Sequence, residues 1–154
     1  MPFNWDVYVW IPRRAPEVLQ AFIDRYVDAE DPGEERLAAF TRTYIDAAPA
    51  DTDAAALAEL VFADSDGFTL YLNSPDHHGA MITITDDGGA VLGLTLDGPD
   101  HLPAVRQRAE QMIDQLRREF SSPAGIAGAE LPPPRSRREW HGEPTPLRVG
   151  TLDP

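Results

Sequence analysis

The sequence predicts an α+β fold in which one antiparallel sheet of about four strands carries helices on one face. Three observations favour this class: an alternating apolar segment near the start, helical patterns before residue 62, and three alternating segments between residues 68 and 96. The expected order is therefore one strand, three helices, three strands and a long helix, followed by a Pro-rich C-terminal extension.

The first strand is expected over residues 5–11, WDVYVWI, because the side chains alternate between two sides. One side is entirely apolar, and the other carries Asp6, Tyr8 and Trp10. The two aromatic rings indicate that this second side is covered by the Pro-rich extension, with an exposed binding platform as the alternative. Pro12 ends the strand because it has no N–H group to donate to a sheet.

Four helices are predicted from apolar residues at three- and four-residue spacing. They lie at about residues 16–26, 37–45, 54–62 and 101–120. Asp51 and Asp53 favour the start of the third helix, because the helix dipole is positive there. Asp100 is a suitable N-cap for the fourth helix, which has the clearest apolar stripe.

Three alternating segments are expected to form an antiparallel meander that is apolar on one face and covered on that side. They are residues 68–72, 81–85 and 91–96. Residues 86–89, DDGG, favour a tight hairpin between the last two segments, because glycine accepts the positive φ that such turns require. Residues 74–79 supply a longer turn between the first two segments.

The chain is divided into a single α+β domain, residues 1–120, and a Pro/Gly-rich extension, residues 121–154. Seven prolines in the extension are typical of a flexible or polyproline-like segment. Its apolar residues predict instead that it packs on the domain; these are Ile126, Leu131, Trp140, Leu147 and Val149. The basic cluster of Arg135, Arg137 and Arg138 is expected to hold the extension against acidic side chains, with an external phosphate or nucleic acid as the alternative.

The charge is strongly negative and unevenly distributed. The chain has 26 acidic residues against 13 arginines and no lysine, for a formal net charge of −13. Residues 1–120 carry 22 of the acids and 9 of the arginines, so the whole net charge lies in this segment. Between Thr43 and Val105 there are eleven acids and no arginine or lysine. Such a surface attracts a basic partner and repels nucleic acid.

Several classes of protein are disfavoured by what the sequence lacks. With no cysteine, the chain forms no disulfide, thiolate metal site or cysteine nucleophile. No run approaches about 18 apolar residues, and the first ten residues have no secretory pattern, so a cytoplasmic protein without a membrane partner is expected. No phosphate-binding loop or nucleophile elbow is present, so we expect no cofactor and assign no catalytic residue.

The histidines of the longer turn are the candidates for a metal site or a general base. His77 and His78 follow Asp76, and imidazole suits both roles near neutral pH. Adjacent histidines in a turn rarely face one ion, however, and no third ligand lies nearby in the sequence. Residues 64–67, DSDG, suggest part of a calcium loop, but two required ligand positions carry no carboxylate, so an ordinary turn is favoured.

The leading functional hypothesis is a non-catalytic protein-binding module whose acidic face meets a basic protein. Bacterial immunity proteins that neutralise basic toxins offer an analogy of charge and size alone. The expected contact residues lie on turns of the meander; they are Asp64, Asp66, Asp76, Asp86 and Asp87. Two alternatives stay open: a small-molecule or metal-dependent enzyme that uses His77, His78 and nearby carboxylates, and a self-associating structural domain.

Overall fold

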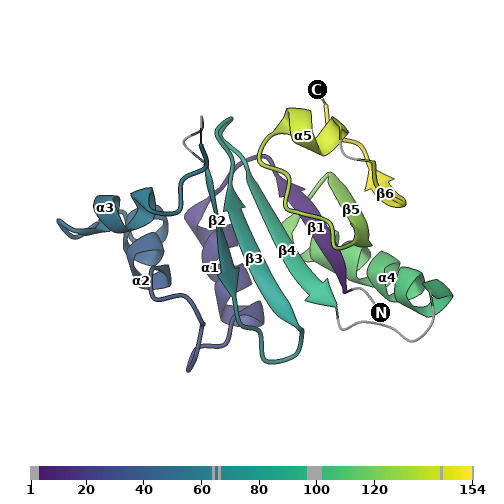
Figure 1. Ribbon diagram of the computed structural model, residues 1–154, viewed down its shortest axis with the longest axis horizontal. Helices are drawn as coiled ribbons and strands as arrows, with labels where there is room; N and C mark the ends of the chain where they lie inside the picture. Colours follow the sequence, from purple (N-terminus) through teal and green to yellow (C-terminus); the bar gives the residue numbers. More distant parts are fainter. Residues whose placement is uncertain (1–3, 64, 66, 97–101, 143, 154) are drawn as a thin grey trace.

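The elements follow the predicted order as far as residue 120 and continue beyond it (Figure 1). The computed structural model describes residues 4–63, 65, 67–96, 102–142 and 144–153. The elements are β1 (Trp5–Ile11), α1 (Pro16–Tyr26), α2 (Leu37–Phe40), the π-helical turn η1 (Thr41–Ile45), α3 (Asp53–Ala58), β2 (Phe68–Leu72), β3 (Gly79–Ile84), β4 (Ala90–Leu96), α4 (Leu102–Phe120), β5 (Ala124–Ala129), α5 (Arg137–Gly142) and β6 (Leu147–Gly150).

The described strands form one antiparallel sheet in the order β2-β3-β4-β1-β5-β6. The α+β class is confirmed, but the prediction of about four strands is wrong, because the sheet has six. The two additional strands, β5 and β6, come from the segment beyond residue 120. β1 lies near the centre of the sheet, with Val7 opposite Leu94 of β4 on one side and Ala127 of β5 on the other.

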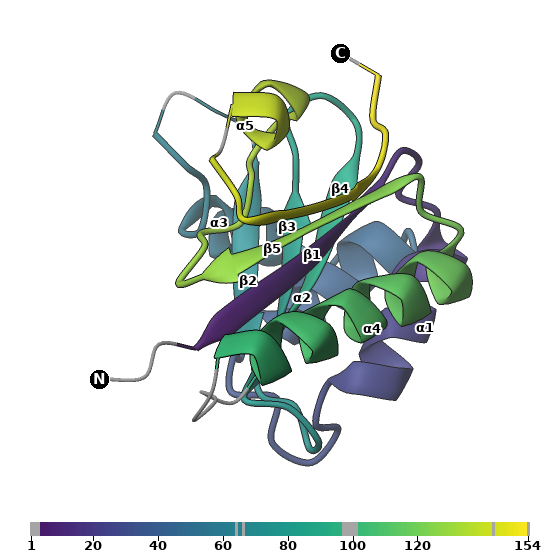
Figure 2. The ribbon, with the colours of Figure 1, turned by 90° about the vertical axis from the view of Figure 1, so that its right-hand side faces the viewer.

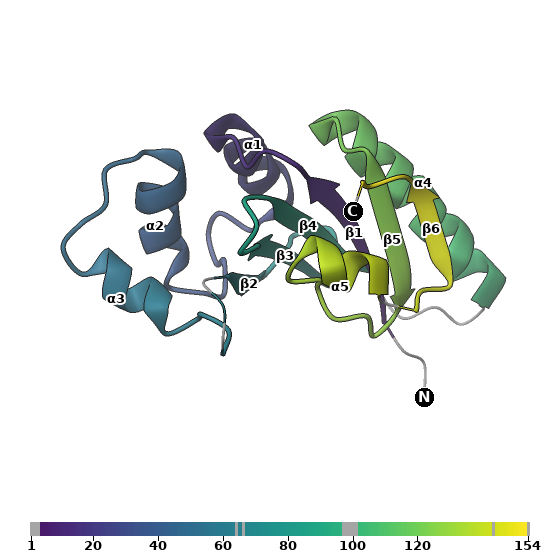
Figure 3. The ribbon, with the colours of Figure 1, turned by 90° about the horizontal axis from the view of Figure 1, so that it is seen from above.

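Helices α1 and α4 cover one face of the sheet (Figure 3). β1 turns Val7 and Val9 towards this face, and both side chains are fully buried there. The two helices supply the facing apolar side chains; these include Leu19, Phe22, Val105, Ala109, Ile113 and Leu116. Burial of each large apolar side chain stabilises the fold by roughly 1.5–3 kcal/mol, so this layer is the main core.

The segment beyond residue 120 covers the opposite face. Figure 2 shows β5 running alongside β1, with α4 and α5 on different sides of the strands. Trp10 is fully buried, and its ring meets Trp140 of α5 edge-on at 5.7 Å between centroids. The predicted cover over Tyr8 and Trp10 is therefore confirmed. The single covered face predicted for the meander is wrong, because Met81 and Val91 are buried under the same segment.

The helices α2 and α3, with η1 between them, lie beyond the β2 edge of the sheet (Figures 1 and 3). The ring of Phe40 stacks on Tyr44 with centroids 5.0 Å apart, and both rings contact Phe68 of β2. Asp53, which is 1% exposed, accepts hydrogen bonds from Nε and a terminal nitrogen of Arg42 at 2.9 and 2.8 Å. This bidentate pair ties α3 to η1.

The hairpin predicted from residues 86–89 is present between β3 and β4. The N–H of Thr85 donates to the carbonyl of Gly89 at 3.2 Å, and the Thr85 hydroxyl accepts from the N–H of Gly89 at 2.9 Å. Gly88 has a φ of 91°, a left-handed conformation that other residues rarely adopt. The turn residues of the sequence therefore predicted this hairpin for the correct physical reason.

Helix α4 carries too many charged residues to cross a bilayer. α4 has 19 residues and is the longest helix described. Its outer side carries several exposed charges, among them Arg106 and Glu110, which form an ion pair at 3.5 Å. Within the described ranges, no helix combines the length and the apolar character of a membrane span.

Candidate functional site

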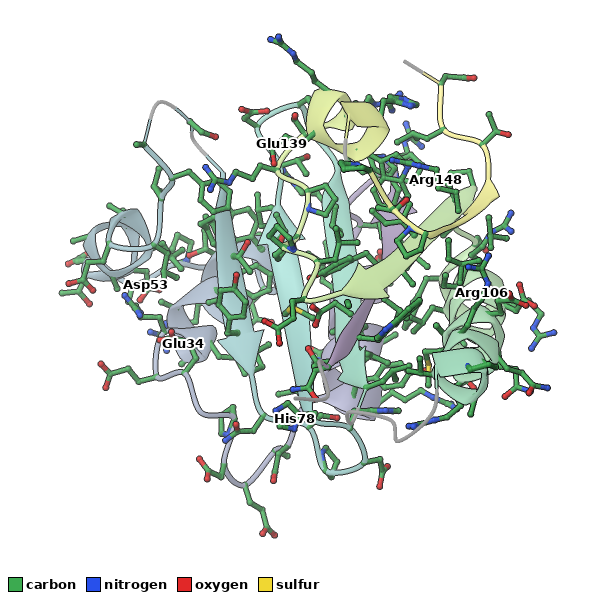
Figure 4. The ribbon with its side chains drawn as sticks, turned by 45° about the vertical axis from the view of Figure 1, so that its right-hand side comes forward. Glu34, Asp53, His78, Arg106, Glu139 and Arg148 are labelled. Carbon is green, nitrogen blue, oxygen red and sulfur yellow. The ribbon has the colours of Figure 1, made fainter. Side chains whose placement is uncertain are left out.

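The structure places the three predicted partner-binding aspartates that it describes at two ends of the sheet. Because β2, β3 and β4 are antiparallel, the β2–β3 turn with Asp76 and the β3–β4 turn with Asp86 and Asp87 lie at opposite ends. Figure 4 shows the same separation, with His78 at one end of the strands and Glu139 at the other. Asp64 and Asp66 lie outside the described residues. The partner-binding role of all five aspartates stays a prediction.

The end that holds the β3–β4 turn, here called the hairpin end, already makes contacts with the C-terminal segment. Asp87 accepts the backbone N–H of Arg137 at 2.9 Å, and Asp86 accepts the hydroxyl of Ser65 at 3.1 Å. The guanidinium group of Arg137 lies 5.7 Å from the Trp10 ring centroid. That of Arg14 donates to the carbonyl groups of the turn at 2.9 and 3.0 Å. One oxygen of each aspartate is therefore already engaged by a hydrogen bond from within the chain.

The opposite end gathers acidic residues from two distant parts of the sequence. Asn73, which follows β2, joins the β2–β3 turn to the loop between α1 and α2. Its N–H donates to the carbonyl of Pro32 at 2.8 Å, its amide Nδ2 donates to the carbonyl of Asp31 at 3.1 Å, and its own carbonyl accepts the N–H of Asp28 at 2.9 Å. We call this surface the acidic end; its members are Asp28, Glu30, Asp31, Glu34, Glu35 and Asp76.

Most carboxylates of the acidic end face solvent. Glu34 is the exception that forms a close ion pair, since Arg36 donates to both of its oxygens at 2.7 and 2.9 Å and lowers its pKa. Glu30, Asp31, Glu35 and Asp76 are exposed. A shallow depression of about 570 Å³ lies over residues 31–36. This arrangement concentrates negative potential at one end of the sheet, where it attracts cationic groups.

The two adjacent histidines do not act as a pair. The ring of His77 packs against Tyr26 of α1 with centroids 5.8 Å apart, on the helix-covered side. His78 influences the pKa of Asp6, whose side chain lies on the opposite side of the sheet. No group of three His, Asp or Glu side chains in the described part of the chain could hold a metal ion. A metal or catalytic role for His77 and His78 stays a prediction without a specific observation in its favour.

A second feature near the acidic end was missed in the sequence. Asp6 of β1 pairs with Thr95 of β4, which pairs in turn with Gly79, the first residue after the β2–β3 turn. Asp6 opens into a cleft of about 270 Å³, here called the Asp6 cleft. The residues that shape it include Asp6, Tyr8, Tyr71, Thr95, Glu130 and Pro132. The ring of Tyr71 stands at this cleft with 62% of the residue exposed.

Partial burial changes the acidity of Asp6. Removal from water raises its pKa to about 6, and the negative charge of Glu130 adds to this effect. The hydroxyl of Thr95, which donates to Oδ1 at 2.7 Å, acts in the opposite direction, as do a backbone hydrogen bond with Leu131 and the charge of His78. Perturbed carboxyl groups in clefts are frequent at functional sites, which makes the Asp6 cleft a candidate.

One wall of the cleft is shaped by Tyr8 of β1, whose ring lies over Gly93 of the neighbouring strand β4. A Cβ atom at Gly93 would come within 2.5 Å of the Tyr8 ring, so glycine is needed opposite this side chain. The Tyr8 hydroxyl donates to the carbonyl of Leu131 at 2.5 Å and fixes the start of the Pro-rich strap, residues 131–134. One feature of the sequence could have indicated the site: Asp6 is the only acid on the aromatic side of the first predicted strand.

No protein-family model, curated protein or solved structure matches this chain.

Proposed function

We propose that this chain is a non-catalytic protein-binding module that meets a basic protein through its acidic end. The observation that supports the proposal is the joining of the acidic loop between α1 and α2 to the turn that carries Asp76 by the three hydrogen bonds of Asn73. The loop between α1 and α2 carries five of the six carboxylates of the acidic end, and the β2–β3 turn adds Asp76. Arg36 offsets one of these charges through its pair with Glu34, so the end as a whole stays strongly negative. Opposite fields on two proteins speed their encounter and fix their orientation.

The net charge of the chain also indicates the class of its partner. The net charge of −13 repels the phosphate backbone of nucleic acids, so a protein with an excess of lysine and arginine is the complementary partner. Under this proposal the chain resembles bacterial immunity proteins in charge and size, acts in the cytoplasm, and covers the substrate site of a basic toxin such as a nuclease.

The proposal is tested with the basic proteins encoded beside the gene for this chain. Each is purified and titrated into the full chain from about 50 mM to about 500 mM NaCl. We expect one of them to bind with an affinity that falls at least about tenfold over this range, and to lose its enzymatic activity at one equivalent of the chain. An affinity that does not change with salt would contradict the proposal.

Two triple variants separate the acidic end from net charge in general. The first is Glu30→Gln, Asp31→Asn and Asp76→Asn, which removes three exposed charges from the acidic end. The matched control is Glu17→Gln, Glu110→Gln and Asp114→Asn, which removes three exposed charges from α1 and α4. We expect the first to weaken binding by about tenfold and the control by less than about twofold. Equal losses would show that the acidic end is not the contact surface.

A further inference from the structure

We propose that the Asp6 cleft binds the guanidinium group of an arginine side chain presented by the basic partner. This inference rests on the proposed function for the source of the arginine and adds the position at which it docks. Three features of the cleft carry it: two carboxylates, an exposed aromatic ring, and walls that are already held in place.

The carboxylates supply the charge. Asp6 lies at the base of the cleft, and Glu130 is close enough for its charge to act on Asp6. A carboxylate offers about four acceptor positions, and the bonds to Thr95 and Leu131 use two of them. Asp6 therefore keeps the capacity to accept two N–H groups from a guanidinium, and the partial burial of the site strengthens such hydrogen bonds.

The ring of Tyr71 supplies a flat apolar surface beside the carboxylates. The residue lies on the edge strand β2 and is 62% exposed, so its ring is accessible to a ligand. Asp6 and Tyr71 line the same cleft. Partial burial raises the pKa of Tyr71 and the negative charge of Asp6 adds to this effect, whereas the positive charge of Arg135 opposes it. An aromatic face next to a carboxylate is the environment in which a cation gains both cation–π and ionic interactions.

Arginine suits this cleft better than lysine. A planar guanidinium stacks on a tyrosine ring while its edge donates two parallel hydrogen bonds to a carboxylate. It is also less strongly hydrated than an ammonium group, so it enters a partly dry cleft at lower cost. The chain contains one such contact of a guanidinium with an aromatic ring, since that of Arg135 lies 4.4 Å from the ring centroid of Phe62.

The walls of the cleft are preorganised. Tyr8 is 1% exposed, and its hydroxyl holds the carbonyl of Leu131, so the strap over residues 131–134 is fixed before any ligand arrives. The N–H of Glu130 also donates to the carbonyl of Asn4 at 2.9 Å. A site that does not have to be ordered on binding loses less conformational entropy.

The experiment titrates the full chain, ¹⁵N-labelled, with three probes at pH 7.5 and constant ionic strength. The first probe is the blocked peptide Gly-Ser-Arg-Ser-Gly, the second is the same peptide with neutral citrulline in place of arginine, and the third is agmatine, a free small organic cation. We expect the arginine peptide to shift the amide resonances of Tyr71, Thr95 and Leu131, with a dissociation constant on the order of millimolar. The citrulline peptide should leave them unchanged.

Two variants and a charge-matched control sharpen the result. Asp6→Asn should weaken the arginine peptide by about tenfold, and Tyr71→Ser, an exposed substitution that leaves the core intact, by about threefold. Asp76→Asn removes the same charge from the acidic end outside the cleft and should change affinity by less than about twofold. Equal effects of Asp6→Asn and Asp76→Asn, or equal binding of the arginine and citrulline peptides, would overturn the inference.

Three further outcomes are decisive. If agmatine binds more than about a hundredfold more tightly than the arginine peptide, the cleft is a small-molecule site and the assignment to a protein arginine is overturned. If the acidic-end triple variant abolishes partner binding while Asp6→Asn and Tyr71→Ser do not affect it, the inference fails and the proposed function stands. If the arginine peptide binds in the cleft but no adjacent basic protein binds with salt dependence, the proposed function fails although the cleft recognises guanidinium.

Discussion

The pKa of Asp6 is set by its partial burial and by neighbours on β4, in the β2–β3 turn, and at and just before the strap. Partial burial and the negative charge of Glu130 favour the protonated form, whereas Thr95, Leu131 and His78 favour the ionised form. The outcome is a pKa of about 6, which lies above the ordinary value of 3.8. The folded chain therefore holds this proton more tightly than the unfolded chain does.

This difference gives the stability of the protein a pH dependence that can be measured. The contribution of Asp6 to the free energy of unfolding is largest below about pH 4 and is lost as the pH rises through about 6. We expect Asp6→Asn to be more stable than the unchanged chain at pH 8, by about 1 kcal/mol once solvent contact of the carboxyl is allowed for, and no more stable at pH 4. Urea denaturation of both proteins at pH 4 and pH 8 measures this difference in the free energy of unfolding. A difference that is the same at both pH values, or that Asp76→Asn reproduces, would contradict this assignment.

Among the elements, those with regular side-chain patterns could be predicted from the sequence. β1 runs over the predicted residues, and the meander and α4 follow their apolar periodicities. β5, with the sequence AGIAGA, could not be recognised because alanine and glycine show no alternation. Its small residues have a physical cause: a Cβ atom at Gly125 would lie 2.4 Å from a methyl group of Ile113 in α4. Glycine is needed at this position because a helix packs directly on the strand.

The candidate site could be predicted only in part, because contacts between residues distant in the sequence leave no local pattern. The sequence identifies Asp76 as a turn residue, and the meander topology alone separates it from Asp86 and Asp87. The link to the loop between α1 and α2 depends on the three hydrogen bonds of Asn73, which no periodicity indicates. Asp6 could be noticed as the only acid on the aromatic side of the first predicted strand. Its cleft, however, is completed by Glu130 and the strap, about 125 residues further along the chain.

The packing of α3 against η1 depends on Asp53. The sequence predicts this residue at a helix start, because a carboxylate interacts favourably with the positive end of the helix dipole. Hydrogen bonds from Arg42, and then from the N–H of Ala50 at 2.7 Å, lower the pKa of Asp53 to about 2. Its contribution to stability is therefore present above about pH 4 and is lost as the pH falls towards 2. We expect Asp53→Asn to lower the urea midpoint at pH 7, with a difference that shrinks below pH 4. The exposed Asp51→Asn serves as the control, and an equal effect of the two substitutions would contradict the role of the ion pair.

At the scale of the whole molecule, the boundary predicted at residue 120 can be tested directly. A chain of residues 1–120 lacks β5 and β6 and uncovers the apolar side chains on the second face of the sheet; these include Tyr8, Trp10, Met81 and Val91. We therefore expect it to lose cooperative unfolding and the dispersion of its ¹H–¹⁵N spectrum. Residues 1–152 keep Leu152 and should retain both properties. A well-dispersed spectrum from residues 1–120 would instead support an autonomous domain.

The central place of β1 has a consequence for synthesis on the ribosome. β1 is the first strand of the sheet to be made, but its neighbours are β4, beginning 79 residues after β1 ends, and β5, which comes later still. At the usual rate of about 5–20 residues per second, Trp5–Ile11 waits roughly 4–16 s before either edge can pair. During this interval a nascent segment of high β-propensity is open to misassembly, so a chaperone that shields WDVYVWI should raise the yield of correctly assembled protein.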